Sequence, residues 1–294
     1  MEIIRTVSWM KQFAHKERAE NRILGLVPTM GALHEGHISL IKRARTECSS
    51  VVASIFVNPT QFSPSEDFAK YPRNLQGDTA KLEAAGIDAL FLPEGKDIYP
   101  PNYSTYVTVE GLSECLEGRL RPGHFRGVST VVLKLLQIVE PHFAYFGRKD
   151  AQQAAIISRM AADLNLDFEI VVCPIVREAD GLAMSSRNVY LNAEERSAAS
   201  ILHRALRAGQ KSLQNGARDS ASLQSAMQNV LGSEPRAKVD YVEVVDAETF
   251  QPIASISRNA YVLLAARFGN TRLLDNLLVK YAPGSTASEP HIEL

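Results

Sequence analysis

Two histidines that lie three residues apart, His34 and His37, have a type and spacing that suggest chemistry. They belong to the segment PTMGALHEGH, residues 28–37, between an apolar run and a stretch with helical periodicity. A pair at this spacing shares one face of a first helical turn, where unpaired N–H groups and the helix dipole favour a phosphate chain. Gly36 lets a ligand approach the backbone. The imidazoles could donate hydrogen bonds to phosphate oxygens as charge moves onto a departing pyrophosphate.

Surface histidines near a turn, or two metal ligands, are the alternatives for this pair. For an isolated H-x-x-H those alternatives would be favoured. Here the strand–turn–helix context favours nucleotide binding, and no third ligand lies beside the pair as a zinc site requires.

A second polar segment, FVNPTQF at residues 56–62, supplies uncharged amides. Asn58 and Gln61 can both donate and accept hydrogen bonds, which suits the hydroxyl and carboxylate groups of a small polar substrate. The alternative is simple turn chemistry, because Asn-Pro commonly begins a loop. Alone, this segment is a weak indication.

A third segment, FGRKDAQQ at residues 146–153, supplies charge. Lys149 could neutralise a transferring phosphate, and Gln153 lies one turn further on the same helix face. Asp150 could orient Lys149 or lie beside a magnesium ion carried by a nucleotide. The alternative is an ordinary solvated helix start.

The fourth segment, ADGLAMSSRN at residues 179–188, combines hydroxyls and a guanidinium. Ser185, Ser186 and Arg187 form a set that suits polyphosphate. Gly181 would give the loop freedom to close over a ligand. A polar interdomain linker is the alternative interpretation.

The first half of the chain alternates apolar runs with stretches of helical periodicity. We expect strands at residues 23–27, 51–57, 89–92, 143–146 and 168–176, and helices at 34–48, 74–85, 128–139 and 149–164. Strands that are apolar on both faces and alternate with helices are typical of a parallel sheet covered on both sides. The sequence therefore predicts an α/β domain.

All four polar segments follow the predicted strands directly. The carboxyl ends of parallel strands form the edge at which open α/β sheets bind ligands. Four unrelated surface loops would not be expected to gather at that one edge. Their shared position favours an anionic, nucleotide-like ligand over the separate alternatives.

From about residue 178 the strand–helix alternation stops. Helices are expected at 193–209 and 222–231, and strands at 241–245, 260–266 and 273–279. We therefore predict a first domain at 1–176, a smaller α+β domain at 177–282, and a disordered tail, PGSTASEPHIEL, at 283–294.

Composition excludes several classes of function. A net charge of -1 gives no indication of nucleic-acid or acidic-membrane binding. The 3 cysteines are far apart, with no C-x-x-C pair, and are expected to be buried thiols in a reducing compartment. No apolar stretch is long enough to span a bilayer, and the N-terminus lacks a signal-peptide pattern, so we expect a cytoplasmic protein.

The four segments together resemble a known family. HEGH, residues 34–37, resembles the HIGH-type motif of the nucleotidyltransferase superfamily, which includes class I aminoacyl-tRNA synthetases, and MSSR, residues 184–187, is similar to its KMSKS-type partner. With VPTMGALHEGH, FVNPTQF, RPGHFRGV and KDAQQ, the resemblance narrows to the pantothenate synthetase family. It covers most of residues 20–195 and continues more weakly to about residue 280. The family usually has FGEKD in the third segment, where this chain has Arg148.

This resemblance implies a Rossmann-like domain with a smaller C-terminal lid domain, a homodimer, and the Mg²⁺-dependent reaction of pantoate, ATP and β-alanine to pantothenate, AMP and pyrophosphate. It implies that ATP is bound by Met30, Gly31, Ala32, Leu33, His34, Glu35, Gly36, His37, Gly147, Arg148, Lys149, Asp150, Val176, Met184, Ser185, Ser186 and Arg187. Gln61 and Gln153 would hold pantoate, with Gln61 also near β-alanine, and Asn58 is a further substrate-binding candidate. The metal ligands stay open.

The implied mechanism begins with attack of the pantoate carboxylate on the α-phosphorus, which gives an acyl adenylate that the amine of β-alanine then attacks. No residue is a candidate for a covalent intermediate, so positioning and charge stabilisation should supply most of the rate. His34, His37, Lys149, Ser185, Ser186 and Arg187 are the candidate catalytic residues. A nucleotidyltransferase that leaves the nucleotide on its product, a non-catalytic nucleotide sensor and a tRNA-binding synthetase remnant are the competing hypotheses.

Overall fold

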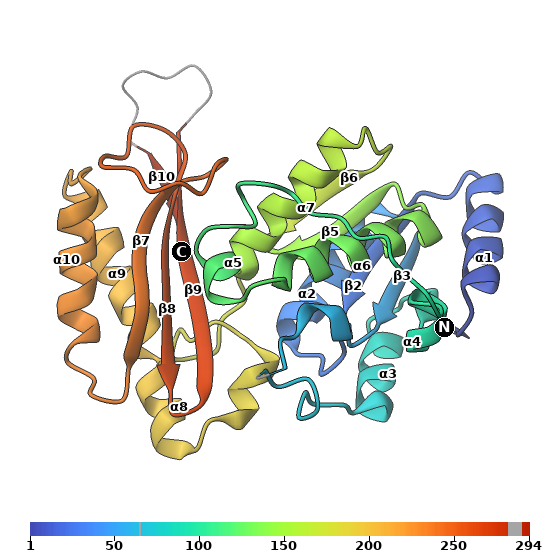
Figure 1. The fold of residues 1–294 in the computed structure, drawn as a ribbon, viewed down its shortest axis with the longest axis horizontal. Helices are drawn as coiled ribbons and strands as arrows, with labels where there is room; N and C mark the ends of the chain where they lie inside the picture. The colour runs from blue at the N-terminus through green and yellow to red at the C-terminus, as the bar shows by residue number, and fades with distance from the viewer. Residues whose placement is uncertain (65, 282–289) are drawn as a thin grey trace. The chain divides into compact units, whose positions relative to one another are not determined.

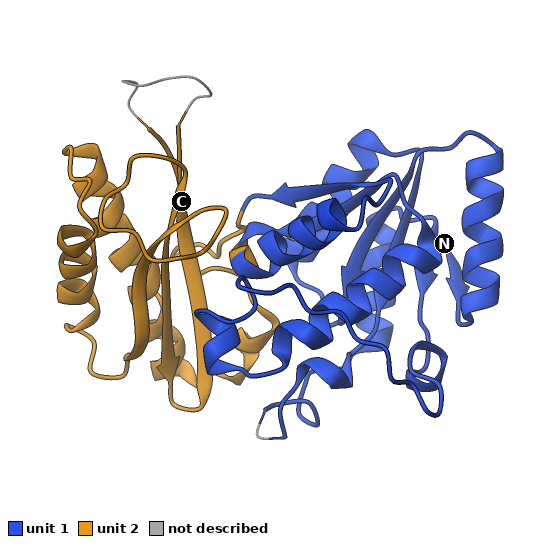
Figure 2. Ribbon diagram, turned by 45° about the horizontal axis from the view of Figure 1, so that its top comes forward, with its two compact units in different colours: residues 1–148, 152–174 blue, residues 149–151, 175–294 orange. Residues whose placement is uncertain are grey.

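The computed structural model describes residues 1–64, 66–281 and 290–294. Contacts divide the chain into two compact units, with residues 1–148 and 152–174 in unit 1 and residues 149–151 and 175–294 in unit 2 (Figure 2). The main division falls two residues before the predicted boundary at 176. No sequence pattern indicated that 149–151 would join the second unit.

Unit 1 is built on a parallel sheet of 6 strands in the order β1-β4-β3-β2-β5-β6. Figure 1 labels β2, β3, β5 and β6 of this sheet. The strands are β1 Glu2–Ile4, β2 Leu24–Thr29, β3 Ser50–Ile55, β4 Ala89–Phe91, β5 Phe143–Gly147 and β6 Glu169–Cys173. Every residue of β3 is buried, as expected for a strand covered on both faces. The α/β prediction is confirmed.

Helices cover both faces of this sheet. They are α1 Val7–Ala19, α2 Glu35–Glu47, α3 Leu75–Ala84, α4 Gly95–Ile98, α5 Glu117–Leu120, α6 His124–Val139 and α7 Ala151–Asp163, with short 3₁₀ turns η1 Pro59–Gln61 and η2 Arg148–Asp150. Helix α2 packs against Val27 and Val51 on one face, whereas α1 and α6 contact β2. Among the described residues, no helix combines the length and apolar character needed to cross a membrane.

The strand order reverses direction between β2 and β5. From β2 the chain passes through α2 to β3 on one side, and from β5 through α7 to β6 on the other. The carboxyl ends of two such strands leave a crevice between the loops that follow them, which is where open α/β sheets hold ligands. The loop after Thr29 and the turn after Gly147 therefore begin at the switch point.

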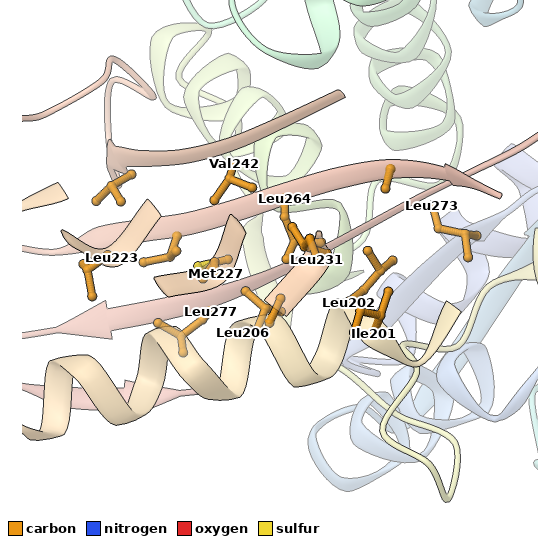
Figure 3. Close-up of a cluster of buried hydrophobic side chains, with 14 of the residues drawn as sticks. Ile201, Leu202, Leu206, Leu223, Met227, Leu231, Val242, Leu264, Leu273 and Leu277 are labelled. Carbon is orange, nitrogen blue, oxygen red and sulfur yellow. The ribbon is translucent and has the colours of Figure 1, made fainter. Parts of the chain in front are cut away.

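Unit 2 is an antiparallel sheet of 4 strands with helices packed on it. Its elements are η3 Ser186–Tyr190, α8 Ala193–Ala199, α9 Ile201–Gln214, α10 Ser220–Leu231, β7 Lys238–Asp246, β8 Ala260–Phe268, β9 Thr271–Lys280 and β10 His291–Glu293. Leu206 and Met227 pack with Leu264 and Leu277 in one apolar core between helices and sheet (Figure 3). The prediction of a smaller α+β fold here is confirmed.

Two expectations for unit 2 were wrong. The single helix predicted at 193–209 is two helices that are separated at Ser200, and the second of these helices continues to Gln214. The Ser200 hydroxyl donates to the Ser197 carbonyl at 2.9 Å. A Ser side chain that bonds the backbone competes with the helical hydrogen bonds and bends or ends helices.

The prediction of a disordered tail at 283–294 was wrong for residues 291–293. Residues 282–289 lie outside the described residues, but His291–Glu293 pairs antiparallel with β9 as strand β10. Lys280 and Glu293 form an ion pair at 2.9 Å, and Ile292 packs against the core. Without β10, β9 would be an edge strand with unpaired backbone groups. The alternating apolar residues Ile292 and Leu294 pack against the core of unit 2.

Candidate active site

The loop that follows β2 has a strained backbone that begins the candidate site. Thr29 Oγ1 donates to the Ser54 carbonyl at 2.7 Å and accepts from the Gly31 N–H at 3.1 Å. The chain then turns through positive φ at Gly31 (80°) and at Ala32 (52°). A residue with a β-carbon adopts that conformation only when its surroundings impose it.

The surrounding group that imposes it is Asp78, at the start of α3. Its two carboxylate oxygens accept from the N–H groups of Ala32 and Leu33, each at 2.8 Å, and the side chain is buried. Lys81, one turn later, donates to the Leu33 carbonyl. Sequence reasoning missed both residues, because an acid and a lysine on a predicted helix are indistinguishable from ordinary surface charges.

His34 and His37 cap helix α2 reciprocally. His34 Nδ1 accepts from the Gly36 N–H at 3.2 Å, and His37 Nδ1 accepts from the His34 N–H at 3.3 Å, with the ring centroids 4.1 Å apart. An imidazole that accepts at Nδ1 carries its proton on Nε2 when neutral. Both rings are thus arranged as Nε2 donors at the start of α2.

Asn58 and Gln61 lie at the end of β3, and both side chains are buried. Asn58 Nδ2 donates to Gln61 Oε1 at 3.0 Å and to the Gly127 carbonyl at 3.1 Å. Asn58 Oδ1 accepts from the hydroxyls of Tyr99 and Thr60. Both polar groups of Asn58 are therefore engaged within the protein, and the side chain holds the amide of Gln61 in one orientation.

The RPGHFRGV segment supports Gln61 from helix α6. His124 Nδ1 bonds the Gln61 carbonyl at 2.8 Å, while Nε2 lies 3.0 Å from Arg121 Nη1. Because a guanidinium only donates, Nε2 is the acceptor and the proton resides on Nδ1. Burial, and then the nearby Arg121 charge, lowers the pKa of His124 to about 4. Arg121 in turn forms an ion pair with Glu66.

Gly127 makes a close approach between α6 and η1. A β-carbon there would lie 2.4 Å from the Thr60 carbonyl oxygen and 2.7 Å from Gln61 Cα. Only glycine allows this contact, which fixes the backbone beneath Gln61.

Residues 147–153 follow β5 at the switch point. Gly147 ends the strand, Arg148 is buried, and Gln153 lies half-buried in the first turn of α7. Its neighbour Gln152 is buried and donates to the Leu112 and Cys115 carbonyls at 2.8 and 2.9 Å. The two adjacent glutamines thus have different surroundings, and Gln153 is the more exposed.

Unit 2 holds the remaining charged candidates. Lys149 Nζ contacts Asp150 Oδ1 at 3.4 Å, and the Lys149 carbonyl accepts from Asn276 Nδ2 at 3.0 Å. The Asp150 carboxylate lies beside the Lys149 ammonium, as the predicted role of Asp150 in orienting Lys149 requires.

The loop that carries Met184–Arg187 is held by hydrogen bonds between its own residues. The Met184 N–H donates to the Val176 carbonyl at 3.0 Å, and Ser185 Oγ accepts from the Arg187 N–H at 3.3 Å as the cap of η3. Asn188 Nδ2 donates to Glu178 at 2.8 Å. The candidate residues Val176, Met184, Ser185, Ser186 and Arg187 therefore belong to one small, bonded loop.

Gly181 packs closely in this loop, a contact that the sequence did not predict, and its role in letting the loop close over a ligand stays a prediction. Its φ is +90°, and a β-carbon would lie 2.1 Å from the ring of His203. Arg196 also binds the loop through Asp180 and Glu178, each at 2.6 Å. These contacts anchor the described loop to α8 and α9.

No group of three or more His, Cys, Asp or Glu residues that could hold a metal occurs among the described residues. Mg²⁺ in nucleotide sites is held mainly by phosphates and water with one or two carboxylates. The single carboxylate of Asp150, adjacent to Lys149, fits that mode of binding.

Residues 2–278 match the family described as Pantoate-beta-alanine ligase. The chain belongs to the pantoate-β-alanine ligase family. It is 51% identical over 280 residues to the Pantothenate synthetase of Acetivibrio thermocellus, covering 95% of this chain and 100% of that protein. The protein of the same name from Thermotoga neapolitana is 52% identical over 279 residues, with the same coverage.

Solved structures agree with this assignment. The Pantothenate Synthetase of Thermus thermophilus is 44% identical with a TM-score of 0.90, covering 94% of this chain and 98% of that one. The Pantoate-beta-alanine Ligase of Francisella tularensis, solved as a complex with Beta-gamma ATP and β-alanine, is 36% identical with a TM-score of 0.78 and covers 94% and 97%. The fold class and the family expected from the sequence are confirmed, and this chain is a ligase.

The pKa of His124 makes the stability of this ligase pH-dependent. In the unfolded chain the imidazole takes up a proton near its ordinary pKa of 6.5, but in the folded state only near 4. Between these values the unfolded state binds more protons, so the free energy of unfolding falls as the pH drops through this window, by about 3 kcal/mol in total. Urea unfolding at pH 7 and pH 4.5 measures it.

His124→Asn is the control variant, because its amide can replace the Nδ1–H donor but does not titrate. We expect the wild type to lose more stability than this variant between the two pH values. Equal losses would show that His124 is not the titrating group.

The Asp78 carboxylate should hold the turn between β2 and α2. Asp78→Asn leaves one oxygen for two N–H groups, so one buried donor loses its partner at about 1–3 kcal/mol. We expect a lower unfolding free energy and a higher KM for ATP. Asp97→Asn, which alters the exposed α4 cap, is the control and should change neither by a comparable amount. If the Asp78→Asn variant is destabilised but its KM for ATP is unchanged, the turn does not contribute to ATP binding.

Proposed function

We propose that this ligase condenses pantoate with β-alanine at the expense of ATP, by way of a pantoyl adenylate. The observation that supports it most is the reciprocal cap of His34 and His37 at the start of α2, directly after β2 at the switch point of the sheet. The relative from Francisella tularensis, solved with Beta-gamma ATP and β-alanine, supports the choice of substrates.

The phosphates of ATP are proposed to lie at the N-terminus of α2. The dipole and the N–H groups of that turn attract negative charge, and the two Nε2 donors of His34 and His37 add neutral hydrogen bonds. The turn Met30–Leu33, held by Asp78, would line the nucleotide with backbone rather than side chains. Glu35 and Gly36 complete the predicted ATP-binding set in the first turn.

Pantoate is proposed to bind Gln61 and Gln153, with Gln61 also near β-alanine. The buried Asn58 fixes Gln61 Oε1, so the Gln61 Nε2 group, 3.3 Å from Met30 Sδ, is directed toward the turn after β2. Asn58 as a direct substrate ligand stays a prediction, and its bonds within the protein favour a positioning role instead.

Charge that moves onto pyrophosphate is proposed to be stabilised from unit 2. Lys149 supplies an ammonium, and Ser185, Ser186 and Arg187 supply hydroxyls and a guanidinium. Gly147, Arg148, Asp150, Val176 and Met184 would complete the ATP site. Closure of unit 2 as a lid, which protects the adenylate from water, is part of the same proposal.

The two steps balance as follows. A pantoate carboxylate oxygen attacks the α-phosphorus of ATP. The bond between that phosphorus and the oxygen that bridges it to the β-phosphorus breaks, and pyrophosphate leaves. The neutral amine of β-alanine then attacks the acyl carbon, loses a proton, and displaces AMP. Both steps move charge onto phosphate oxygens, so fixed donors that are already in place lower the barriers.

Mg²⁺, homodimer formation and a cytoplasmic location also belong to this proposal. Mg²⁺ would neutralise phosphate charge when it is bound, and Asp150 is a carboxylate beside the proposed phosphate ligand Lys149.

The nucleotide product tests the proposed reaction. The protein is mixed with ATP, Mg²⁺ and pantoate, with and without β-alanine, and the products are separated. We expect AMP and pyrophosphate in equal amounts, with turnover that depends on β-alanine. A product that retains the nucleotide would favour a nucleotidyltransferase instead, and tight ATP binding without turnover would favour a sensor.

His37 variants separate capping from catalysis. In His37→Asn the amide oxygen can still accept from the His34 N–H, but the Nε2 donor is gone. We expect near-normal stability and a loss of kcat of about 100-fold or more, as for removal of a transition-state donor. His37→Gln places a donor near the Nε2 position and should lose less rate. The assignment fails if Asn is the more active variant.

Lys149→Ala should also lose about 100-fold or more in kcat, because a cation beside the transferring phosphate is absent. Lys96→Ala removes an exposed lysine that pairs with Glu94, and should keep wild-type kcat. Near-UV circular dichroism checks that both variants fold. Near-normal pantothenate production by folded Lys149→Ala would remove this residue from the mechanism.

A further inference from the structure

Two consecutive buried residues of β9, Asp275 and Asn276, make side-chain hydrogen bonds in addition to the backbone hydrogen bonds of the strand. Both are 1% exposed in the middle of the strand. Successive side chains of a strand project to opposite faces, so the pair can reach two different segments. The segments that they reach are the two parts of unit 2 proposed to bind ATP.

Asp275 binds the base of the loop that carries Met184–Arg187. Its oxygens accept from Arg177 Nη1 at 2.6 Å and Nη2 at 3.0 Å, and Arg177 Nη1 also donates to the Gly181 carbonyl at 3.0 Å. The forked guanidinium thus fixes the loop to the strand in one orientation. His203 packs against Gly181 from α9, and burial lowers the pKa of this imidazole.

Asn276 binds the segment that carries Lys149. Its Nδ2 donates to the Lys149 carbonyl at 3.0 Å, across 127 residues of sequence. The N–H of Asn276 donates to Asp275 Oδ1 at 2.8 Å, so the two connections share one carboxylate. Residues 149–151 belong to unit 2, as this strand does.

We propose that Asp275 and Asn276 are positioning residues for the reaction, which set the Lys149 segment and the Met184–Arg187 loop in register with one another. The inference rests on the proposed function. A single rigid strand that holds both segments keeps the ammonium and the loop donors at a fixed separation. Catalysis by preorganised charge depends on such spacing, and a displacement of about 1 Å lowers rates by roughly 100-fold.

Asn276→Leu tests the Lys149 connection, because it keeps the size of the side chain and removes the donor. We expect folded protein with kcat at least 10-fold lower. Gln224→Leu is the matched control, since Gln224 Nε2 donates to the Val242 carbonyl at 2.9 Å in the same unit, away from both segments. It should show a similar change in melting temperature with wild-type kcat.

A double-mutant cycle distinguishes positioning from general destabilisation. If Asn276 acts through Lys149, then Asn276→Leu should change kcat by less than 2-fold in a Lys149→Ala background. If the double variant loses kcat by the product of the two single-variant losses, the proposal is overturned. Should Asn276→Leu not fold, Asn276→Asp, which replaces the donor with an acceptor at the same size, takes its place in the cycle.

Arg177→Lys tests the second connection, because a lysine keeps the charge but cannot reproduce the forked contact of two nitrogens with the two Asp275 oxygens. We expect a rise in KM for ATP of at least 5-fold, with KM for β-alanine unchanged, and faster hydrogen exchange in residues 182–188. Unchanged exchange and KM would overturn this half of the inference. Wild-type turnover in the same assay tests the proposed function separately, so the two failures are distinguishable.

Discussion

The buried carboxylate of Asp78 is the constraint on which the turn between β2 and α2 in unit 1 depends. A turn of two left-handed residues, Gly31 and Ala32, would relax if its N–H groups found other partners. Asp78 accepts from the N–H groups of Ala32 and Leu33, each at 2.8 Å, and Lys81 donates to the Leu33 carbonyl. The start of α2, with both imidazoles, is placed by this turn. Helix α3 therefore positions the start of α2, where the ATP phosphates are proposed to lie.

The same arrangement recurs at Gln61 and Lys149, because a buried polar group holds each of them. Asn58 orients Gln61, and His124 holds the Gln61 backbone from the other side. In unit 2, Asn276 holds the backbone of Lys149. Buried amides and imidazoles have no water to bond, so they maintain a single geometry, which preorganised catalysis requires.

Buried charge is handled by pairing in both units. Arg121 lies between Glu66 and His124 in unit 1, and burial, followed by the Arg121 charge, lowers the pKa of His124 to about 4. In unit 2, the buried Asp275 has a forked partner in Arg177. A buried charge without its partner strongly destabilises a protein, so these pairs specify one arrangement of the loops that they hold.

The amino-acid sequence by itself determined the α/β class, most element positions and the four polar segments. Strand–helix periodicity is local, and turns such as that after Thr29 follow their strands directly, so the carboxyl-end placement of His34, Gln61 and Lys149 was predictable. The family followed from the motifs, and residues 2–278 match it.

Only the tertiary structure decided which residues hold those segments. Asp78 and Asn276 act on partners 46 and 127 residues away in sequence, and neither differs in type or spacing from a surface acid or a strand amide. It also showed strand β10 at residues 291–293, within the predicted disordered tail, and the close packing of Gly181 on His203. Burial and long-range hydrogen bonds are properties of the folded chain, so local periodicity does not carry them.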